Sequence, residues 1–335
     1  MKRVVAYSAI PEDLLLRLQE HHAVTTFDHI HVGNRATFVA AVHAAHGLLG
    51  ASVAITRELL EPARDLEAIS TISVGYDQFD VDYLTTRGIV LSHTPDVVTE
   101  STADTIVALM LASARRVVEL AEFVRAGNWK RSIDSTLYGV DVHGKTLGIL
   151  GMGRIGRAVA RRARLGFGMD ILYYGRRDAP EAESAFGARR LPLDELLKTS
   201  DFVCVVLPLD ASTEQLIGER EFSLMKPGAI FINGARGRIV DESALVAALE
   251  SGRLRAAGLD VFEREPLAPS SPLAQLPNVV ALPHAGSATV ETRYAMCQLA
   301  VDNLISALAG RPRHVVNLSA MARRRSAAAQ LEPGK

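Results

Sequence analysis

The fold is decided by the stretch Thr146-Leu147-Gly148-Ile149-Leu150-Gly151-Met152-Gly153-Arg154-Ile155-Gly156. In it, an apolar run leads directly into glycines spaced as GxGxxG. A segment rich in helix formers, Arg157–Leu165, follows. A GxGxxG alone is weak evidence, but the order strand, tight turn and helix is the arrangement that binds a dinucleotide. Gly151 permits the turn, Gly153 lets the backbone approach a pyrophosphate, and Gly156 lets helix and strand pack closely. The helix N-terminus would face the phosphates; the alternative is a glycine-rich turn without a ligand.

The end of the next strand indicates which dinucleotide is bound. NAD sites place Asp or Glu about 20 residues beyond the glycines, to bond the ribose 2′-hydroxyl. Here the strand Asp170–Tyr174 runs into Gly175-Arg176-Arg177 with no carboxylate at its end. Two guanidinium groups can clamp a 2′-phosphate, so we predict NADPH in preference to NADH. Asp178 follows immediately and leaves NADH open.

Apolar runs alternate with helical segments along the chain. Several runs are continuous, as expected of parallel strands covered on both faces. One long helix is predicted from near Ser101, where Ser101 and Asp104 have capping-box spacing, and another from Thr289 to about Leu308. The pattern predicts an α/β doubly wound fold. The predicted strands are Val4–Ala6, Ser52–Ile55, Thr71–Val74, Ile89–Ser92, Leu147–Leu150, Ile171–Tyr174, Phe202–Leu207, Ala229–Ile232, Ala257–Val261 and Val279–Leu282.

Size and composition indicate an ordinary globular protein. The 335 residues exceed what one hydrophobic core usually serves, so two domains are expected. The 37 Lys and Arg nearly balance 38 Asp and Glu, and nothing directs the chain to nucleic acid or a membrane surface. Cys204 and Cys297 are too few for a disulfide framework or a cysteine metal site, and no metal is predicted. Without a membrane span or a good secretory signal, the expected location is the cytoplasm.

Three segments beyond the glycine turn carry side chains suited to catalysis. Arg236 lies in Asn233–Gly237, where an apolar strand ends, and its planar fork suits a carboxylate. Glu265 closes Gly258–Pro266, and His284 stands at a strand end just before a helix start. Each residue alone also has an ordinary structural explanation. Sequence spacing does not show whether Glu265 and His284 touch.

These motifs reveal a resemblance to the D-isomer-specific 2-hydroxyacid dehydrogenases, from about Val4 to Val316. Four motifs occur in that family's order, which makes the signal strong. Within the family the chain looks most like the bacterial glyoxylate/hydroxypyruvate reductases that also take 2-ketogluconate; Ile72–Asp77 and Asp141–Leu147 fit that branch well. The four motifs are Gly148–Gly156, Asn233–Gly237, Gly258–Phe262 and Pro283–Thr289.

The resemblance implies a role for each matching position. His284 would protonate the carbonyl oxygen as hydride reaches C2, and Glu265 would bond the other imidazole nitrogen. Arg236 would hold the substrate carboxylate, together with the backbone of Ser73, Val74 and Gly75. Gly234 stands where the family more usually has threonine, serine, valine or alanine. The implied cofactor-binding residues are Thr102, Leu150, Gly151, Gly153, Arg154, Ile155, Gly156, Arg176, Arg177, Pro208, Thr213, Gly234, Ala235, Asp260 and Gly286.

The resemblance also implies two doubly wound parallel-sheet domains, a Rossmann nucleotide domain inserted into a flavodoxin-like substrate domain. Residues 1–98 and 287–318 would bind substrate, residues 99–286 would bind NAD(P), and the cleft would lie between them. Residues 319–335 would form a flexible tail. The segment Ala103–Tyr138 would include the arm of a homodimer. Trp129 and Tyr138 could reach the partner's cleft, although packing in the core is the commoner role for either alone.

Other functions share this fold and many of these residues. A dinucleotide-sensing protein that resembles the family's transcriptional corepressors could keep the same trio, but no recruitment region or basic face is evident. Phosphoglycerate dehydrogenase is a rival, although many such enzymes carry a regulatory domain for which this chain has no room. Formate dehydrogenase fits less well because of Arg176-Arg177. The preferred keto acid among glyoxylate, hydroxypyruvate and 2-ketogluconate stays open.

Overall fold

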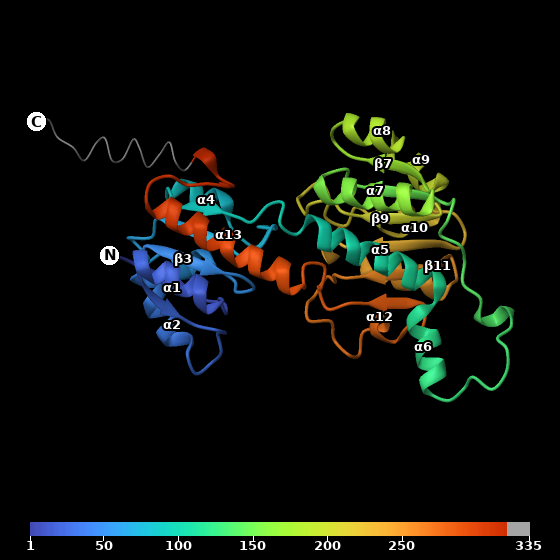
Figure 1. The fold of residues 1–335 in the computed structure, drawn as a ribbon, viewed down its shortest axis with the longest axis horizontal. Helices are drawn as coiled ribbons and strands as arrows, with labels where there is room; N and C mark the ends of the chain where they lie inside the picture. The colour runs from blue at the N-terminus through green and yellow to red at the C-terminus, as the bar shows by residue number, and fades with distance from the viewer. Residues whose placement is uncertain (320–335) are drawn as a thin grey trace, which may run out of the picture. The chain divides into compact units, whose positions relative to one another are not determined.

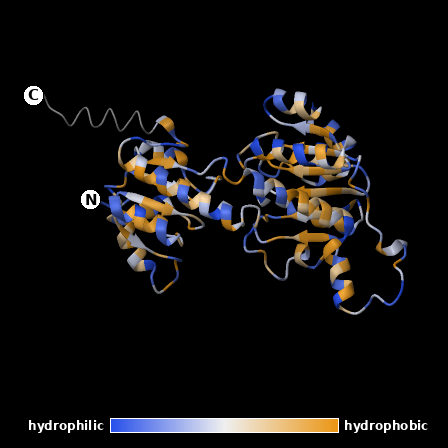
Figure 2. Ribbon diagram, in the orientation of Figure 1, coloured by the Kyte–Doolittle hydropathy of each residue, from blue (hydrophilic) through white to orange (hydrophobic). Residues whose placement is uncertain are grey.

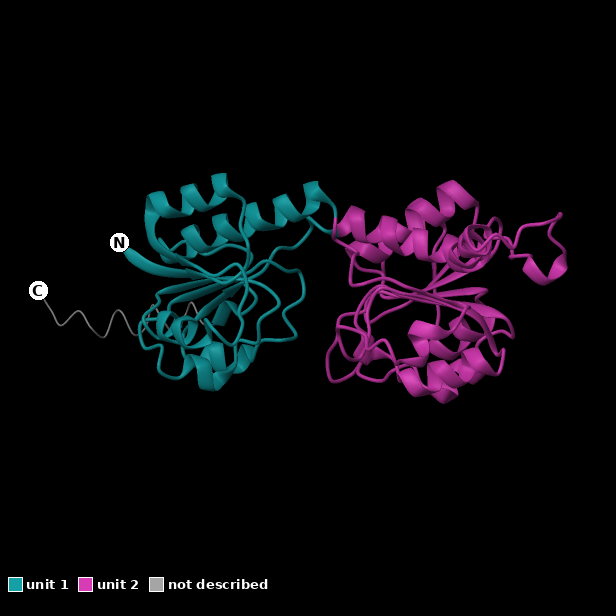
Figure 3. Cartoon of the chain, turned by 90° about the horizontal axis from the view of Figure 1, so that it is seen from below, with its two compact units in different colours: residues 1–98, 289–335 teal, residues 99–288 magenta. Residues whose placement is uncertain are grey.

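The structure, a computed structural model, describes residues 1–319. The chain divides into two compact units (Figure 3). Unit 1 comprises Met1–Val98 and the part of the chain from Thr289 onward, and unit 2 comprises Thr99–Ala288. The second crossing thus falls after Ala288 rather than after Gly286. The tail predicted over residues 319–335 lies almost wholly outside the described residues.

Unit 1 is built on five parallel strands in the order β2-β1-β3-β4-β5. This is the flavodoxin-like order. In Figure 3 helices cover both faces of the sheet. Its strands are β1 (Lys2–Ala6), β2 (His22–Thr26), β3 (Gly47–Gly50), β4 (Ala68–Thr71) and β5 (Val90–Ser92), and its helices are α1 (Glu12–His21), α2 (Arg35–His43), α3 (Arg57–Leu60), α4 (Val81–Thr86) and α13 (Val290–Leu308).

Unit 2 is built on seven parallel strands in the order β12-β11-β10-β9-β6-β7-β8. The chain starts in the middle at β6, fills one side and then returns to fill the other, which is the Rossmann order with one added strand. The strands are β6 (Thr146–Leu150), β7 (Asp170–Tyr174), β8 (Arg189–Arg190), β9 (Phe202–Val205), β10 (Ala229–Asn233), β11 (Leu254–Leu259) and β12 (Val279–Ala281).

The helices of unit 2 pack on both faces of this sheet, and Figure 1 shows α5 lying along it. Figure 2 shows the strands mostly in the colours of apolar residues, consistent with burial on both faces. The predicted fold class is therefore confirmed. The helical elements are α5 (Thr99–Arg115), α6 (Val117–Arg125), η1 (Ser135–Leu137), α7 (Arg154–Phe167), α8 (Pro180–Phe186), α9 (Leu193–Thr199), α10 (Glu219–Leu224), η2 (Gly237–Ile239), α11 (Glu242–Glu250) and α12 (Pro272–Gln275).

Two predicted strands of unit 1 are misplaced. Ser52–Ile55 is not a strand, because β3 lies earlier, at Gly47–Gly50. Its glycines are required by packing: a Cβ at Gly50 would meet the ring of Tyr7, and one at Gly47 would meet the side chain of Leu308. Residues 71–74 contribute only Thr71 to β4, which begins three residues earlier. Strands β2 and β8 were not predicted.

Both predicted long helices are present, and each begins within two residues of its predicted start. Thr289 caps α13, since its side chain accepts the Thr292 N–H at 3.1 Å. Ser101 does not form a capping box, because α5 already begins at Thr99 and the Ser101 carbonyl accepts the Thr105 hydroxyl within the helix. None of the described helices is long and apolar enough to cross a membrane.

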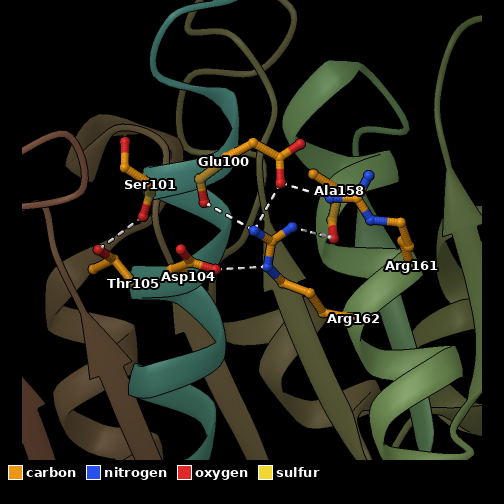
Figure 4. A network of polar contacts seen from close by, with 7 residues as sticks. All are labelled: Glu100, Ser101, Asp104, Thr105, Ala158, Arg161 and Arg162. Atoms are coloured by element: carbon orange, nitrogen blue, oxygen red, sulfur yellow. Dashed lines mark hydrogen bonds and ion pairs between the residues drawn. The ribbon is translucent and has the colours of Figure 1, made fainter. Parts of the chain in front are cut away.

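A cluster of charged side chains joins α5 to α7 (Figure 4). Arg162 on α7 donates to Asp104 Oδ1 and Glu100 Oε2, each at 2.7 Å, and to the carbonyl of Ala158 at 3.1 Å. Arg161 bonds the same oxygen of Glu100 at 2.6 Å. These contacts hold the pKa of Glu100 below its ordinary value. They fix the helix that begins at the glycine turn against the helix that carries Thr102.

Candidate active site

The glycine turn after β6 has the geometry of a pyrophosphate cradle. Gly151 has φ +108°, and a Cβ there would stand 2.9 Å from the backbone of Val206. A Cβ at Gly156 would collide with the Gly151 carbonyl, so helix and turn approach as closely as the motif requires. Around Gly153, in contrast, no described atom lies within 4 Å of the Cβ position, and this residue caps α7 without a side-chain hydrogen bond. The residues therefore fit a dinucleotide phosphate group at the start of α7.

The turn after β7 lies close to this cradle, since a Cβ at Gly175 would stand 4.0 Å from the Met152 nitrogen. Arg176 and Arg177 are both exposed. Arg176 Nη1 lies 3.3 Å from Asp210 Oδ2, so the turn contacts the loop after β9. The two predicted arginines thus lie at the carboxyl edge of the sheet, where a ribose phosphate would need them.

The loop after β9 is organised by Thr213. Its hydroxyl donates to the Pro208 carbonyl at 2.7 Å and accepts the Asp210 N–H at 2.8 Å. Thr213 is buried, and its hydroxyl is engaged within the loop. That Pro208 and Thr213 bind the cofactor stays a prediction.

The catalytic candidates follow the carboxyl ends of three adjacent parallel strands, β10, β11 and β12. Arg236 follows β10, where buried Asn233 accepts the Ala235 N–H at 3.1 Å and donates to the Arg236 carbonyl at 3.0 Å. Gly237 packs directly on the backbone of Phe262, which leaves no room for a Cβ. The loop of Arg236 therefore lies against the loop that leads to Glu265.

Glu265 and His284 do touch. Glu265 Oε2 lies 2.7 Å from His284 Nδ1, and Glu265 Oε1 accepts the Phe262 N–H at 3.0 Å. Burial alone would raise the pKa of Glu265, but these hydrogen bonds and the charges of His284 and Arg236 hold that pKa below its ordinary value. The carboxylate is thus ionised and leaves Nε2 of His284 as the nitrogen that can face a substrate.

Asp260, at the end of β11, fixes the backbone beside His284. Its two oxygens accept the N–H groups of Ala285 at 2.6 Å and Gly286 at 2.8 Å. His284 itself has φ +54°, in the left-handed region that is costly for a residue with a side chain. Burial raises the pKa of Asp260 despite the two N–H donors. A Cβ at Gly286 would stand 2.9 Å from Asp260 Oδ2 and 3.4 Å from Thr102, so these three predicted residues lie together.

A neighbouring side chain explains why position 234 is a glycine. A Cβ at this position would stand 2.6 Å from the buried side chain of Ile106 on α5. The family's more usual larger residues would therefore require α5 to lie slightly farther from β10. Leu150 and Ala235, the other predicted contacts beside the turns, are buried.

The predicted substrate-binding residues of unit 1 form a compact turn after β4. The Ser73 carbonyl accepts the Thr94 N–H, the Val74 carbonyl contacts Nδ1 of His93 at 2.9 Å, and the Gly75 carbonyl accepts the Ser73 hydroxyl. Among the described residues, no hydrogen bond is found for the N–H groups of Ser73, Val74 and Gly75. Successive N–H groups of this kind suit an anion such as a carboxylate.

The segment predicted as a dimer arm divides into two parts. α5 buries Ala103 and Ile106 in the core of unit 2, whereas α6 has no buried residue and projects from the sheet (Figure 1). Trp129 is 64% exposed and Tyr138 is 54% exposed, so core packing is wrong for both. A cavity of about 410 Å³ lies between this segment and the amino ends of β11 and β12, whereas His284 follows the carboxyl end of β12.

Several residues of this arrangement were not predicted from the sequence. Arg190 binds Asp178, His93 orients the Val74 carbonyl, and Asn233 shapes the Arg236 loop. Asn233 opens a predicted motif, which was a usable signal. Arg190 and His93 carry no such signal, because their roles depend on which strands are neighbours.

Known proteins resemble this chain over most of its length. Residues 107–286 match the D-isomer specific 2-hydroxyacid dehydrogenase, NAD binding domain. Glyoxylate/hydroxypyruvate reductase B of Salmonella schwarzengrund is 57% identical over 308 residues, which cover 92% of this chain and 95% of the relative.

Solved structures agree with this relation. A protein of Thermus thermophilus superposes with a TM-score of 0.86 at 43% identity, over 94% of this chain and 99% of that one. The NADPH-dependent glyoxylate/hydroxypyruvate reductase of Sinorhizobium meliloti, solved with NADP and malonate, has a TM-score of 0.82 at 34% identity, over 95% and 97%. The sequence match, the relative and the two-sheet architecture agree, and the chain therefore belongs to the D-isomer-specific 2-hydroxyacid dehydrogenase family.

Proposed function

We propose that this protein reduces small 2-keto acids to D-2-hydroxy acids with NADPH, with glyoxylate, hydroxypyruvate and 2-keto-D-gluconate as substrates. The observation that carries the proposal is the 2.7 Å contact of Glu265 with His284, on a loop that neighbours the loop of Arg236. Under this proposal, His284 is an oriented proton donor and Arg236 is a carboxylate-binding guanidinium, and both follow the carboxyl ends of strands in the nucleotide-binding sheet.

Each side chain has a defined task in this reaction. When bound, the reduced nicotinamide supplies the hydride that reduces C2 of the keto acid. Nε2 of His284 delivers a proton to the carbonyl oxygen, which becomes the hydroxyl of the product. Glu265 orients the imidazole through Nδ1 and compensates its positive charge before transfer. Arg236 holds the substrate carboxylate and stabilises negative charge on the carbonyl oxygen, with the N–H groups of Ser73, Val74 and Gly75 as further carboxylate donors.

The preference for NADPH is supported by the turn after β7. Arg176 and Arg177 offer two cations there, and Asp178 is held in an ion pair with Arg190 at 2.7 Å rather than standing free for a ribose diol. The Sinorhizobium meliloti relative is named as NADPH-dependent.

A homodimer formed through α6 and the segment that follows accounts for the exposed apolar side chains there. Val117, Val124 and Trp129 are each about half exposed or more, an arrangement that favours burial against a second copy. The cytoplasmic location stays a prediction.

Steady-state oxidation of NADPH with hydroxypyruvate, glyoxylate, 2-ketogluconate and pyruvate tests the proposal, repeated with NADH. The matched variants are His284→Ala and His143→Ala, an exposed histidine of the same unit. We expect fast turnover of one of the first three acids, lost only in His284→Ala. Turnover with NADH alone would contradict the cofactor assignment. NADPH binding without turnover of any acid would instead favour a dinucleotide-sensing protein.

A further inference from the structure

Arg190 makes two polar contacts with the turn that separates β7 from α8. Its Nη1 lies 2.7 Å from Asp178 Oδ1, and its Nη2 donates to the Gly175 carbonyl at 2.7 Å. β8 pairs with β7 in parallel, with Arg190 opposite Tyr173. The register of this two-residue strand thus brings the guanidinium to the carboxyl end of β7, where the turn begins.

The other end of the same turn is hydrogen-bonded to a buried tyrosine. The hydroxyl of buried Tyr173 accepts the Ala179 N–H at 2.9 Å and donates to Glu183 at 2.5 Å. Gly175 is thus bonded to Arg190 and Ala179 to Tyr173, so both ends of the segment that contains Asp178 are anchored. Asp178 is therefore kept on the Arg190 side of the turn.

The position of Asp178 matters because of its charge. It is the carboxylate of the turn, two residues after Arg176 and next to Arg177. An acidic residue in this region selects NAD by bonding the ribose hydroxyls, and it repels a 2′-phosphate. Pairing with Arg190 offsets the charge and occupies one oxygen, and both effects favour the phosphorylated cofactor.

We propose that Arg190 is a positioning residue for cofactor selection, which favours NADP(H) over NAD(H) by restraining and neutralising Asp178. The inference rests on the NADPH preference proposed above and names the residue that tunes it. Arg190 need not touch the cofactor, since its effect passes through Asp178 and the Gly175 carbonyl. Removal of the guanidinium would release a carboxylate beside the two cofactor-facing arginines.

The test compares Arg190→Ala, the double variant Arg190→Ala/Asp178→Asn, and Arg189→Ala, the neighbouring exposed arginine of the same strand. Calorimetric titration gives Kd for NADP⁺ and NAD⁺, and kcat/KM is measured with NADPH and NADH. The affinity ratio in favour of NADP⁺ should fall about fivefold in Arg190→Ala, as expected for one exposed charge contact. It should return to within about twofold of the parent in the double variant. Arg189→Ala should leave the ratio unchanged.

The outcomes separate this inference from the proposed function. A parent protein that binds NAD⁺ more tightly would refute the NADPH assignment, while a shift of the ratio toward NAD⁺ in Arg190→Ala would still support the role of Arg190. An unchanged ratio in Arg190→Ala, with unaltered thermal unfolding, would overturn the inference. A double variant that stays as shifted as Arg190→Ala would overturn the route through Asp178.

Discussion

Asp260 offers the sharpest test of how the site is held together. Asp260 is 3% exposed, and its carboxylate accepts two backbone N–H groups, those of Ala285 and Gly286, immediately after His284. Because His284 has φ +54°, these bonds offset a backbone conformation that costs about 1–2 kcal/mol. We predict that Asp260→Ala frees this segment and moves the imidazole away from its bonded position.

The expected size of the effect follows from the two hydrogen bonds that the substitution removes. Each hydrogen bond to a charged group contributes about 1.5–3 kcal/mol, but the burial that raises the pKa of Asp260 shows that its charge is costly to bury. We therefore expect a loss of about 2–3 kcal/mol in the free energy of unfolding of unit 2. A displacement of about 1 Å at His284 would lower kcat/KM about 100-fold. Asp260→Asn keeps one acceptor oxygen and should lower kcat/KM about tenfold.

Urea unfolding and steady-state kinetics on the same samples make the comparison. Asp201→Ala is the control, because Asp201 also accepts a backbone N–H, that of Thr146 at 2.9 Å. This contact lies at the amino ends of β6 and β9, whereas His284 follows the carboxyl end of β12. The control variant should lose stability while keeping kcat/KM. If Asp260→Ala is destabilised yet retains kcat/KM within about twofold of the parent, the backbone at His284 does not depend on Asp260 and the reasoning is wrong.

Three further predictions concern stability and assembly. Arg162→Ala should lower the stability of unit 2 by about 1–2 kcal/mol. A double-mutant cycle with Glu100→Gln should show a coupling of about 0.5 kcal/mol or more. Additive losses would contradict the network of charged side chains between α5 and α7. Burial lowers the pKa of His22, so stability is full above its unfolded pKa and falls as the pH drops through that value. The urea midpoint of unit 1 should follow this dependence, and His22→Leu should flatten it, whereas His29→Leu, at an exposed histidine of the same unit, should not. Trp129→Ala should shift sedimentation from dimer toward monomer, and a monomeric parent would refute the dimer.

The nucleotide half of the site could be predicted because its signals are local. The turn, the close approach and the helix start all depend on Gly151, Gly153 and Gly156, within six residues of one another. Gly151 needs glycine for its φ of +108°, and a Cβ at Gly156 would collide with the Gly151 carbonyl, so two of these positions are determined within the turn itself. The helix that follows, α7, was therefore recognisable before its neighbours were known.

Strand β3 shows the opposite case. Gly47 and Gly50 argue against a strand by local preference, while the nearby Ser52–Ile55 favours one. The glycines are needed only because Tyr7 and Leu308 pack onto them, and Leu308 is more than 250 residues away in the chain. Such long-range packing overrides local preference and leaves no trace in the segment itself.

The catalytic half was predicted residue by residue, but its contacts depend on strand order. The adjacency of β10, β11 and β12 brings the Arg236 loop against the Glu265 loop and Glu265 to His284. Arg190 was missed for the same reason. Arg189 and Arg190 are both exposed arginines, and only the pairing of β8 with β7 distinguishes the one that reaches Asp178.

The same strand order separates cofactor selection from chemistry. β8 and β12 are the two edge strands of the seven-stranded sheet, so Arg190 and His284 lie on opposite sides of the switch point between β6 and β9. The turn that Arg190 holds follows β7 and Asp260 follows β11, so four strand spacings of about 4.8 Å place the two groups roughly 19 Å apart. Residues this far apart that do not contact one another contribute independently. The losses in kcat/KM caused by Arg190→Ala and Asp260→Asn should therefore multiply in the double variant, with NADPH as the cofactor. A combined loss several-fold from the product would mean that the turn after β7 and the His284 loop respond to one another through the sheet.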